Sequence, residues 1–161
     1  MYPEKIFIRK HPSLEKITIF LNSKETTGEE LKQKIKEKLS IEIEDQELHH
    51  FNSSPLKDDK ELISQKISNN DEIHLIDLSK SKEFKGDNFI FVRSVWSCST
   101  IYVNLANITG FLLAKEIKNT DIFNNDIFIF AGRKIELNDK LSDLGIEEGS
   151  TIHQLNTNAK N

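Results

Sequence analysis

Few residues of this chain have the types and spacing that a reaction needs. The single cysteine, Cys98, lies among Ser97, Ser99 and Thr100, with no histidine close in sequence to serve as its base. No glycine-rich phosphate loop, His-x-x-x-His helix or Gly-x-Ser-x-Gly elbow occurs. The sequence therefore predicts no enzyme, no catalytic residue, no small-molecule substrate and no cofactor.

Adjacent acids and histidines form the other candidate groups. The pairs 58–59 (Asp-Asp) and 147–148 (Glu-Glu) lie in predicted turns, where we interpret them as solvated charges. His49 and His50 could suggest a metal site, but neighbours on a strand point to opposite faces. No third ligand lies near them in sequence, so we expect two surface imidazoles and no metal.

Alternating apolar residues predict the elements that position these groups. A short strand at residues 5–9 is followed, after a turn at Pro12, by a second strand at 17–21. Thr27 and Glu30 are spaced as a capping box for a helix with Leu31, Ile35 and Leu39 on one face. Strands around 48–51 and 72–76 complete the order ββαββ.

The same order returns in the second half of the chain. Strands are expected at 89–93 and 101–105, then a helix capped by Thr109 and buried through Leu113 and Ile117. The strand-like runs 127–132 and 150–155 follow. A charged stretch at 79–87, with small residues, separates the repeats and is typical of a linker. We expect domains at 1–78 and 88–156, with a tail at 157–161.

These patterns resemble ubiquitin, most strongly in the second repeat. The residues responsible are the runs 90–93 (Ile-Phe-Val-Arg), 129–134 (Ile-Phe-Ala-Gly-Arg-Lys), 140–146 (Lys-Leu-Ser-Asp-Leu-Gly-Ile) and 150–153 (Ser-Thr-Ile-His). In the first repeat the similarity is mainly of pattern, at 5–8, 27–35, 56, 62 and 73–75. The resemblance implies an α+β fold of two tandem ubiquitin-like β-grasp domains, each with a mixed sheet packed on one helix.

Ubiquitin-like domains usually bind partners through a shallow apolar patch on the sheet. Carried over by position, the resemblance implies a patch in the second repeat made of Ile129, Gly132, His153, Leu155, Val95 and Trp96. Alternatively, Ile129 and Leu155 are ordinary sheet residues that another part of the chain covers. In the first repeat the corresponding places hold His49, His74 and Ile76, so we do not expect that face to bind standard ubiquitin receptors.

Conjugation is not expected. Ubiquitin-like modifiers end in a Gly-Gly arm, whereas this chain ends in Asn-Thr-Asn-Ala-Lys-Asn, and Gly86 stands alone between the repeats. Arg133 occupies the place of the lysine that most often carries ubiquitin chains, and arginine cannot form an isopeptide bond. The neighbouring Lys134 could form such a bond.

Composition narrows the partners and the compartment. The net charge of −4, from 22 Lys+Arg and 26 Asp+Glu, lacks the basic footprint of a nucleic-acid-binding protein. One cysteine excludes an internal disulfide and favours a reducing compartment. We expect a cytoplasmic protein with no targeting or membrane-inserting segment, either free or held in a cytoskeletal or other large assembly.

The leading hypothesis is a tandem ubiquitin-like protein that is not conjugated. It would be an adaptor for ubiquitin-handling factors or a scaffold subunit of a large assembly. One alternative is a ubiquitin-like modifier that processing makes competent for conjugation. Another is a pair of doublecortin-like β-grasp domains that bind microtubules, although such domains are typically basic.

Overall fold

The computed structural model describes residues 4–50, 54–83, 85–117 and 126–155, in two compact units, Met1–Ser79 and Lys80–Asn161. The expected tail at 157–161 lies outside the described residues, as do Asn156, Phe84 and the end of the strand predicted at 48–51. The segment expected as a linker begins with a 3-10 helix, Leu78–Glu83, that is kinked at Lys80.

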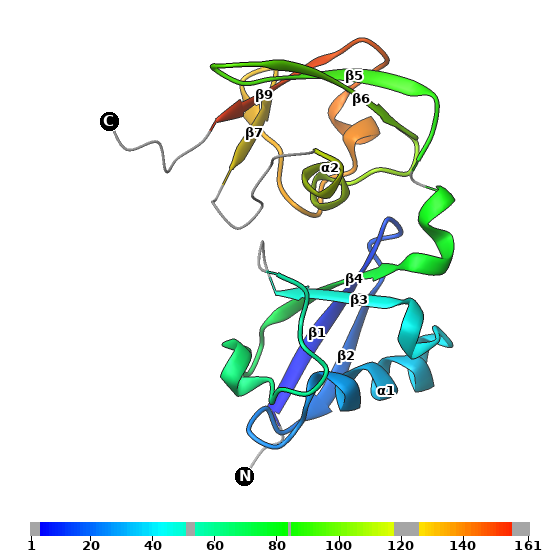
Figure 1. Ribbon diagram of the computed structural model, residues 1–161, viewed down its shortest axis with the longest axis vertical. Coiled ribbons are helices and arrows are strands. Elements are labelled where there is room, and N and C mark those ends of the chain that lie inside the picture. Colours follow the sequence, from blue (N-terminus) through cyan, green and yellow to red (C-terminus); the bar gives the residue numbers. More distant parts are fainter. Residues whose placement is uncertain (1–3, 51–53, 84, 118–125, 156–161) are drawn as a thin grey trace. The chain divides into compact units, whose positions relative to one another are not determined.

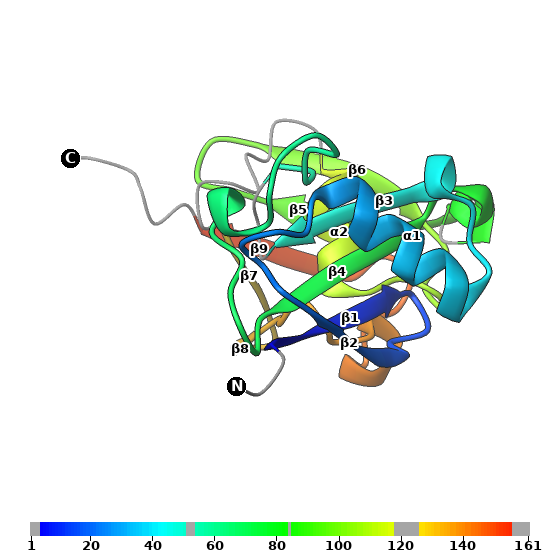
Figure 2. The same cartoon turned by 90° about the horizontal axis from the view of Figure 1, so that it is seen from below.

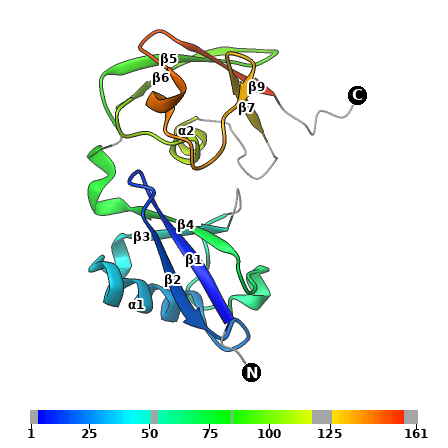
Figure 3. The same ribbon diagram turned by 180° about the vertical axis from the view of Figure 1, so that it is seen from behind.

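The first unit is a four-stranded sheet with one helix across it. Its elements are β1 (Glu4–His11), β2 (Lys16–Leu21), α1 (Gly28–Leu39), β3 (Gln46–His50) and β4 (Glu72–Asp77). Two 3-10 helices, Ile43–Asp45 and Ile63–Gln65, lie before β3 and β4. The strand order is β2-β1-β4-β3, with β1 and β4 parallel and the other pairs antiparallel. Figure 3 shows β1 and β2 side by side, and Figure 2 shows α1 crossing the strands.

The capping box predicted for α1 is confirmed. Thr27 Oγ1 accepts a hydrogen bond from the backbone N–H of Glu30 (3.3 Å), and Glu30 Oε2 accepts one from the backbone N–H of Thr27 (2.8 Å). The helix buries Leu31 and Ile35 completely, while Leu39 is partly buried. These side chains pack against the inward residues of the strands, which makes one apolar core for this unit.

The second unit repeats this arrangement with one additional short strand. Its elements are β5 (Asn88–Arg93), β6 (Cys98–Val103), α2 (Gly110–Glu116), β7 (Ile127–Phe130), β8 (Arg133–Lys134) and β9 (Thr151–Leu155), with a 3-10 helix at Leu141–Leu144 (Figure 1). The order is β6-β5-β9-β7-β8, and β5 and β9 are parallel. The first and last long strands of each unit are therefore parallel neighbours at its centre.

Both helices begin in the same way. Thr109 caps α2 through its side chain, which accepts from the N–H of Leu112, as the sequence predicts. A glycine follows each capping threonine, and a Cβ atom there would collide with a backbone carbonyl oxygen, that of Lys57 for Gly28 and that of Glu136 for Gly110. Only glycine allows this close approach of backbone segments.

The helices differ in length and in how much of their surface is buried. Helix α1 has 12 residues and α2 has 7. Counted from the capping threonine, Phe111 and Leu112 of α2 occupy the places of Glu29 and Glu30 in α1, and they are 1% and 2% exposed. The sequence predicts burial of Leu113 and Ile117 alone, so more of the circumference of α2 is buried than predicted.

Candidate binding surface

Each sheet has an inner face toward its helix and an outer face on the other side. In β5, Ile90 and Val92 are buried on the inner face, and Phe89, Phe91 and Arg93 alternate with them on the outer face. In β9, Ile152 is buried, whereas His153 and Leu155 are exposed. The outer face of the second unit is therefore the surface on which the predicted patch lies.

The strand register gathers part of the predicted patch. Ile129 of β7 lies directly opposite His153 of β9, and Ile127 lies opposite Leu155. These four residues share one face because their positions differ by two along each strand. Ile129 is half-buried and Leu155 is 44% exposed. Three apolar side chains and an imidazole thus lie next to one another on the outer face.

Gly132 lies in the turn between β7 and β8. Its φ of +77° is in the left-handed region, and no atom lies within 4 Å of the place where a Cβ would be. Glycine adopts this conformation without strain. Because glycine has no side chain, the turn carries no bulky group at this position.

Val95 and Trp96 form the tip of the β5–β6 hairpin. The turn is held by the backbone N–H of Ser94, which donates to the carbonyl of Ser97 (2.8 Å). Val95 is 79% exposed and Trp96 is 93% exposed. Because β5 and β9 are parallel, this tip and Leu155 lie at the same end of the sheet.

Cations flank the apolar residues. Arg93 lies opposite His153, and Lys134 lies opposite Ile129, so one row across four strands runs Arg93, His153, Ile129, Lys134. Arg133, next in β8, is also exposed, while Lys134 pairs with Glu136 at 3.5 Å. The patch therefore has an apolar centre with positive charge at both ends of this row.

The first unit presents a different outer face in the same register. His49 lies opposite His74, and Glu47 lies opposite Ile76, as Ile129 lies opposite His153 and Ile127 opposite Leu155 in the second unit. The assignment of His49, His74 and Ile76 to the corresponding places is thus confirmed by the strand pairing.

The expectation that His49 and His50 are surface imidazoles is wrong. His49 is 1% exposed, and the side chain of His50 is 11% exposed. His49 Nε2 lies 2.6 Å from Glu47 Oε1, and His50 Nε2 lies 3.4 Å from Asp71 Oδ2. Glu47 is close to His49 in sequence, but Asp71 comes from a different part of the chain, so sequence neighbours alone do not reveal it as the partner of His50.

His11, which the sequence did not single out, joins this group. Its Nε2 lies 2.8 Å from Nδ1 of His74, and both rings are nearly fully buried. Burial lowers the pKa of His74 to about 4, and burial together with the neighbouring His74 lowers the pKa of His11 to about 2. Both imidazoles are therefore neutral at pH 7, and one donates to the other.

Hydrogen bonds and ion pairs occupy much of this face. Arg9 Nε lies 3.2 Å from Glu72 Oε1, and the ammonium group of Lys16 lies 4.1 Å from the centre of the Phe7 ring. In the described part of the chain, no three His, Cys, Asp or Glu side chains come together as a metal site would need. The first unit thus carries a self-paired polar face where the second carries an apolar patch.

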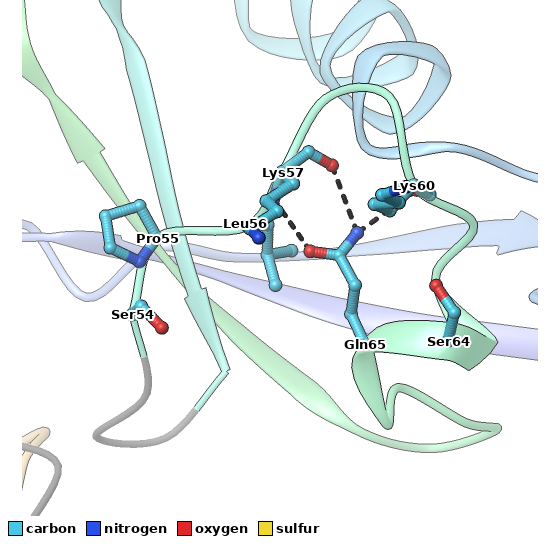
Figure 4. Close-up of a pocket in the computed structure, with 7 residues that line it drawn as sticks. All are labelled: Ser54, Pro55, Leu56, Lys57, Lys60, Ser64 and Gln65. Atoms are coloured by element: carbon cyan, nitrogen blue, oxygen red, sulfur yellow. Dashed lines mark hydrogen bonds between the residues drawn. The ribbon is translucent and has the colours of Figure 1, made fainter.

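The first unit also has a small cavity of about 430 Å³ beside the turn at 57–60, lined by Ser54, Pro55, Leu56, Lys57, Lys60, Ser64 and Gln65 (Figure 4). The amide of Gln65 accepts from the Lys57 N–H (2.7 Å) and donates to the carbonyls of Lys57 (3.0 Å) and Lys60 (3.1 Å). These bonds use the polar atoms of Gln65 to hold the turn, which is a structural role.

The other groups considered for chemistry are placed as follows. Cys98 is exposed at the start of β6, opposite Arg93. Asp58 pairs with Lys32 at 2.8 Å. Glu147 and Glu148 are exposed in the turn before β9.

Comparison with known proteins gives one family. Residues 6–76 match the model of the ubiquitin family, so the first unit is a ubiquitin-like domain. The match lies on the first unit, although the resemblance noted from the sequence is stronger in the second. No match is found among curated proteins. None of the helices in the described ranges is long and apolar enough to cross a membrane.

Proposed function

We propose that this chain is a tandem ubiquitin-like protein that binds other proteins through the outer face of its second unit, as an adaptor or as a subunit of a larger assembly. The observation that carries the proposal is the row in which Ile129 and His153 lie side by side between Arg93 and Lys134. We propose binding, and no catalysis, for this surface.

The match between the two units supports a β-grasp fold for both. In each unit a threonine caps the helix, and the next residue, a glycine, donates to a carbonyl of the returning segment, at 3.0 Å for Gly28 to Lys60 and 2.9 Å for Gly110 to Asp139. The central parallel strand pair is also the same. Agreement in these long-range contacts supports the proposal that the second unit has the same fold as the first.

The chemistry of the surface indicates the kind of partner. The exposed side chains of Leu155 and Trp96 and the half-buried side chain of Ile129 offer anchor sites for a partner helix that carries an apolar stripe. Arg93 and Arg133 favour acidic residues beside that stripe. Ubiquitin-handling factors and neighbouring subunits of an assembly are the two partner classes that we propose.

Binding without conjugation is part of the proposal. The six glycines of the sequence stand singly, so no Gly-Gly pair occurs in it. An antibody to this protein should therefore detect one band in a denaturing gel of cell lysate. A ladder of heavier species that resists boiling in detergent would instead establish a modifier.

A reducing, cytoplasmic location is also proposed, since the one thiol, that of Cys98, is exposed and has no second cysteine to pair with. Cell fractionation should recover the protein with the cytosol or with a cytosolic assembly. Recovery from the lumen of a secretory organelle would contradict this part of the proposal.

The surface is tested by affinity purification of the intact chain with quantitative mass spectrometry. Ile129→Ala should reduce the recovery of specific partners at least tenfold. Phe20→Ala is the matched control, because Phe20 is an exposed apolar strand residue (57%) on the first unit. Equal recovery with wild type and Ile129→Ala, or equal loss in both variants, would refute the proposed surface.

A further inference from the structure

The two sheets have four edge strands, and three of them are protected against pairing with another strand. In β2, the Nζ of Lys38 donates to the outward carbonyl of Thr18 (2.9 Å). Beside β3, the N–H of Leu56 donates to the carbonyl of Leu48 (2.8 Å). Strand β8 consists of two cationic residues, Arg133–Lys134. Lysines, covered edges and short strands are the usual ways in which proteins prevent edge-to-edge association.

Strand β6 has none of these protections. Its six residues, Cys-Ser-Thr-Ile-Tyr-Val, include no charge and no proline, and favour extended structure. Cys98, Ser99, Thr100 and Tyr102 are exposed, Tyr102 by 63%. The edge is thus both open to solvent and suitable for pairing.

The register of the hairpin shows which backbone groups point outward. Ser94 N–H donates to Ser97 O, which makes this a hydrogen-bonded pair, so that hydrogen-bonded and non-hydrogen-bonded pairs alternate from there. Cys98, Thr100 and Tyr102 fall in the pairs that do not bond to β5. The same alternation in the first unit directs the Thr18 carbonyl outward, where Lys38 binds it.

The backbone N–H and C=O groups of these three β6 residues have no hydrogen-bond partner among the described residues. We propose that β6 pairs in antiparallel orientation with β6 of a second copy of this chain, with Thr100 opposite Thr100 of the second copy. In this register Cys98 lies opposite Tyr102 of the second copy, and Tyr102 lies opposite Cys98 of the second copy. Each copy then contributes three donors and three acceptors, all of which find partners.

A second copy suits this edge because the strand is complementary to itself. Uncharged residues meet on both faces, so antiparallel self-pairing creates no like-charge contact. Arg93 lies beside Cys98 in the sheet, which places its guanidinium near the exposed ring of Tyr102 of the second copy, a favourable cation–π geometry. The outer faces of the two second units would then form one continuous surface.

The contact area limits the strength of this dimer. Three hydrogen-bonded residue pairs bury less than the ~1,200 Å² below which interfaces are usually transient. We therefore expect a monomer when dilute and a dimer when concentrated. This inference does not depend on the partner surface proposed above.

Self-association is tested first by sedimentation of the full chain over a wide concentration range. Wild type should show a concentration-dependent dimer. Thr100→Lys should weaken the dimer at least tenfold, because it places two ammonium groups opposite each other across the twofold axis. Ala106→Lys, an equal charge change at an exposed residue outside β6, should leave the dimer intact.

The register is tested by cross-linking two double variants, Cys98→Ser/Thr100→Cys and Cys98→Ser/Tyr102→Cys, with a short thiol-to-thiol reagent. Residues 100 of the two copies should be ~5.5 Å apart between Cα atoms. Residues 102 should be ~14 Å apart, because four residues of strand (~13 Å) and the spacing between the two strands (~5 Å) both separate them. Several-fold more cross-linked dimer at position 100 is expected.

Three results would overturn the proposal. They are a wild-type chain that stays monomeric at every concentration, a dimer that Thr100→Lys and Ala106→Lys affect equally, and cross-linking as efficient at position 102 as at position 100. The thermal melting temperature of Thr100→Lys, expected to equal that of wild type because Thr100 is exposed, separates lost association from lost folding.

Discussion

His11 of β1 and His74 of β4 share a hydrogen bond of 2.8 Å between Nε2 and Nδ1, on the sheet face whose counterpart in the second unit is exposed. The two imidazoles can share one proton on this bond but cannot each carry one there. Arg9 lies near both rings and further opposes a positive charge on either. The pair thus favours the neutral state, and this gives the fold a defined response to acid.

Stability should fall as the pH drops below about 6.5. Because the folded pKa values, about 4 for His74 and about 2 for His11, lie below the ordinary histidine value of 6.5, the unfolded chain binds more protons. Each imidazole then lowers the free energy of unfolding by up to ~1.4 kcal/mol per pH unit, until the pH reaches its folded pKa. Urea denaturation at pH 7, 6, 5 and 4.5 measures this slope.

The substitution His11→Gln should remove about one imidazole's contribution to the pH dependence of the free energy of unfolding. The glutamine amide does not titrate, but it can still hydrogen-bond to His74. His153→Gln is the control, because the ring of His153 is exposed. A pH dependence that His11→Gln leaves unchanged would show that other groups produce the acid response.

Trp96 should behave as a free indole in the isolated chain. It is the chain's one tryptophan and is 93% exposed, so its fluorescence emission should lie at long wavelength and be strongly quenched by iodide. Trp96→Ala should change the free energy of unfolding by no more than ~0.5 kcal/mol. Short-wavelength emission with little quenching would place the indole in a buried site.

Ile129→Ala should cost little stability compared with Ile152→Ala. Ile129 is half-buried on the outer face, whereas Ile152 is fully buried beneath the same sheet. Truncation of a buried isoleucine costs ~2–5 kcal/mol, and a partly exposed one costs less. Chemical denaturation of both variants checks this, and equal losses would mean that Ile129 is a core residue.

Thr27→Ala should destabilise the first unit by ~1 kcal/mol. The substitution removes the hydroxyl that accepts from the Glu30 N–H and so opens the capping box. Thr27→Ser keeps that oxygen and should restore most of the stability. Equal stability of the alanine and serine variants in chemical denaturation would contradict a role for the cap.

Gly28→Ala should be more damaging than Glu29→Ala, although the residues are neighbours on α1. The added Cβ would collide with the carbonyl of Lys57, an overpacking that typically costs ~1–3 kcal/mol. Glu29 is exposed, so its truncation should be nearly neutral. The difference between their melting temperatures measures the effect, and a thermally neutral Gly28→Ala would show that the segments can separate without cost.

The elements of both units could be predicted because their signals are local. Alternation marks the strands, and Thr27, Glu30 and Thr109 mark the helix starts through short-range hydrogen bonds. The residues at equivalent positions on the two outer faces could also be predicted from the sequence, since a matching strand order fixes which residues lie opposite each other.

The burial of the histidines of the first unit could not be predicted in the same way. His49 and His50 look solvated in sequence, and their burial depends on residues from other strands and turns, such as His74 and Asp71. The run Phe111-Leu112 did carry a signal. An uninterrupted apolar stretch in so short a helix indicates burial on more than one side.

The most direct test of the central claim is hydrogen exchange of the native chain, free and in complex with the partners that it purifies with. We expect slower exchange on binding in peptides that contain Ile129, His153 and Leu155, together with the Val95–Trp96 hairpin. Protection confined to the first unit, with the exchange of β7 and β9 unchanged, would contradict it.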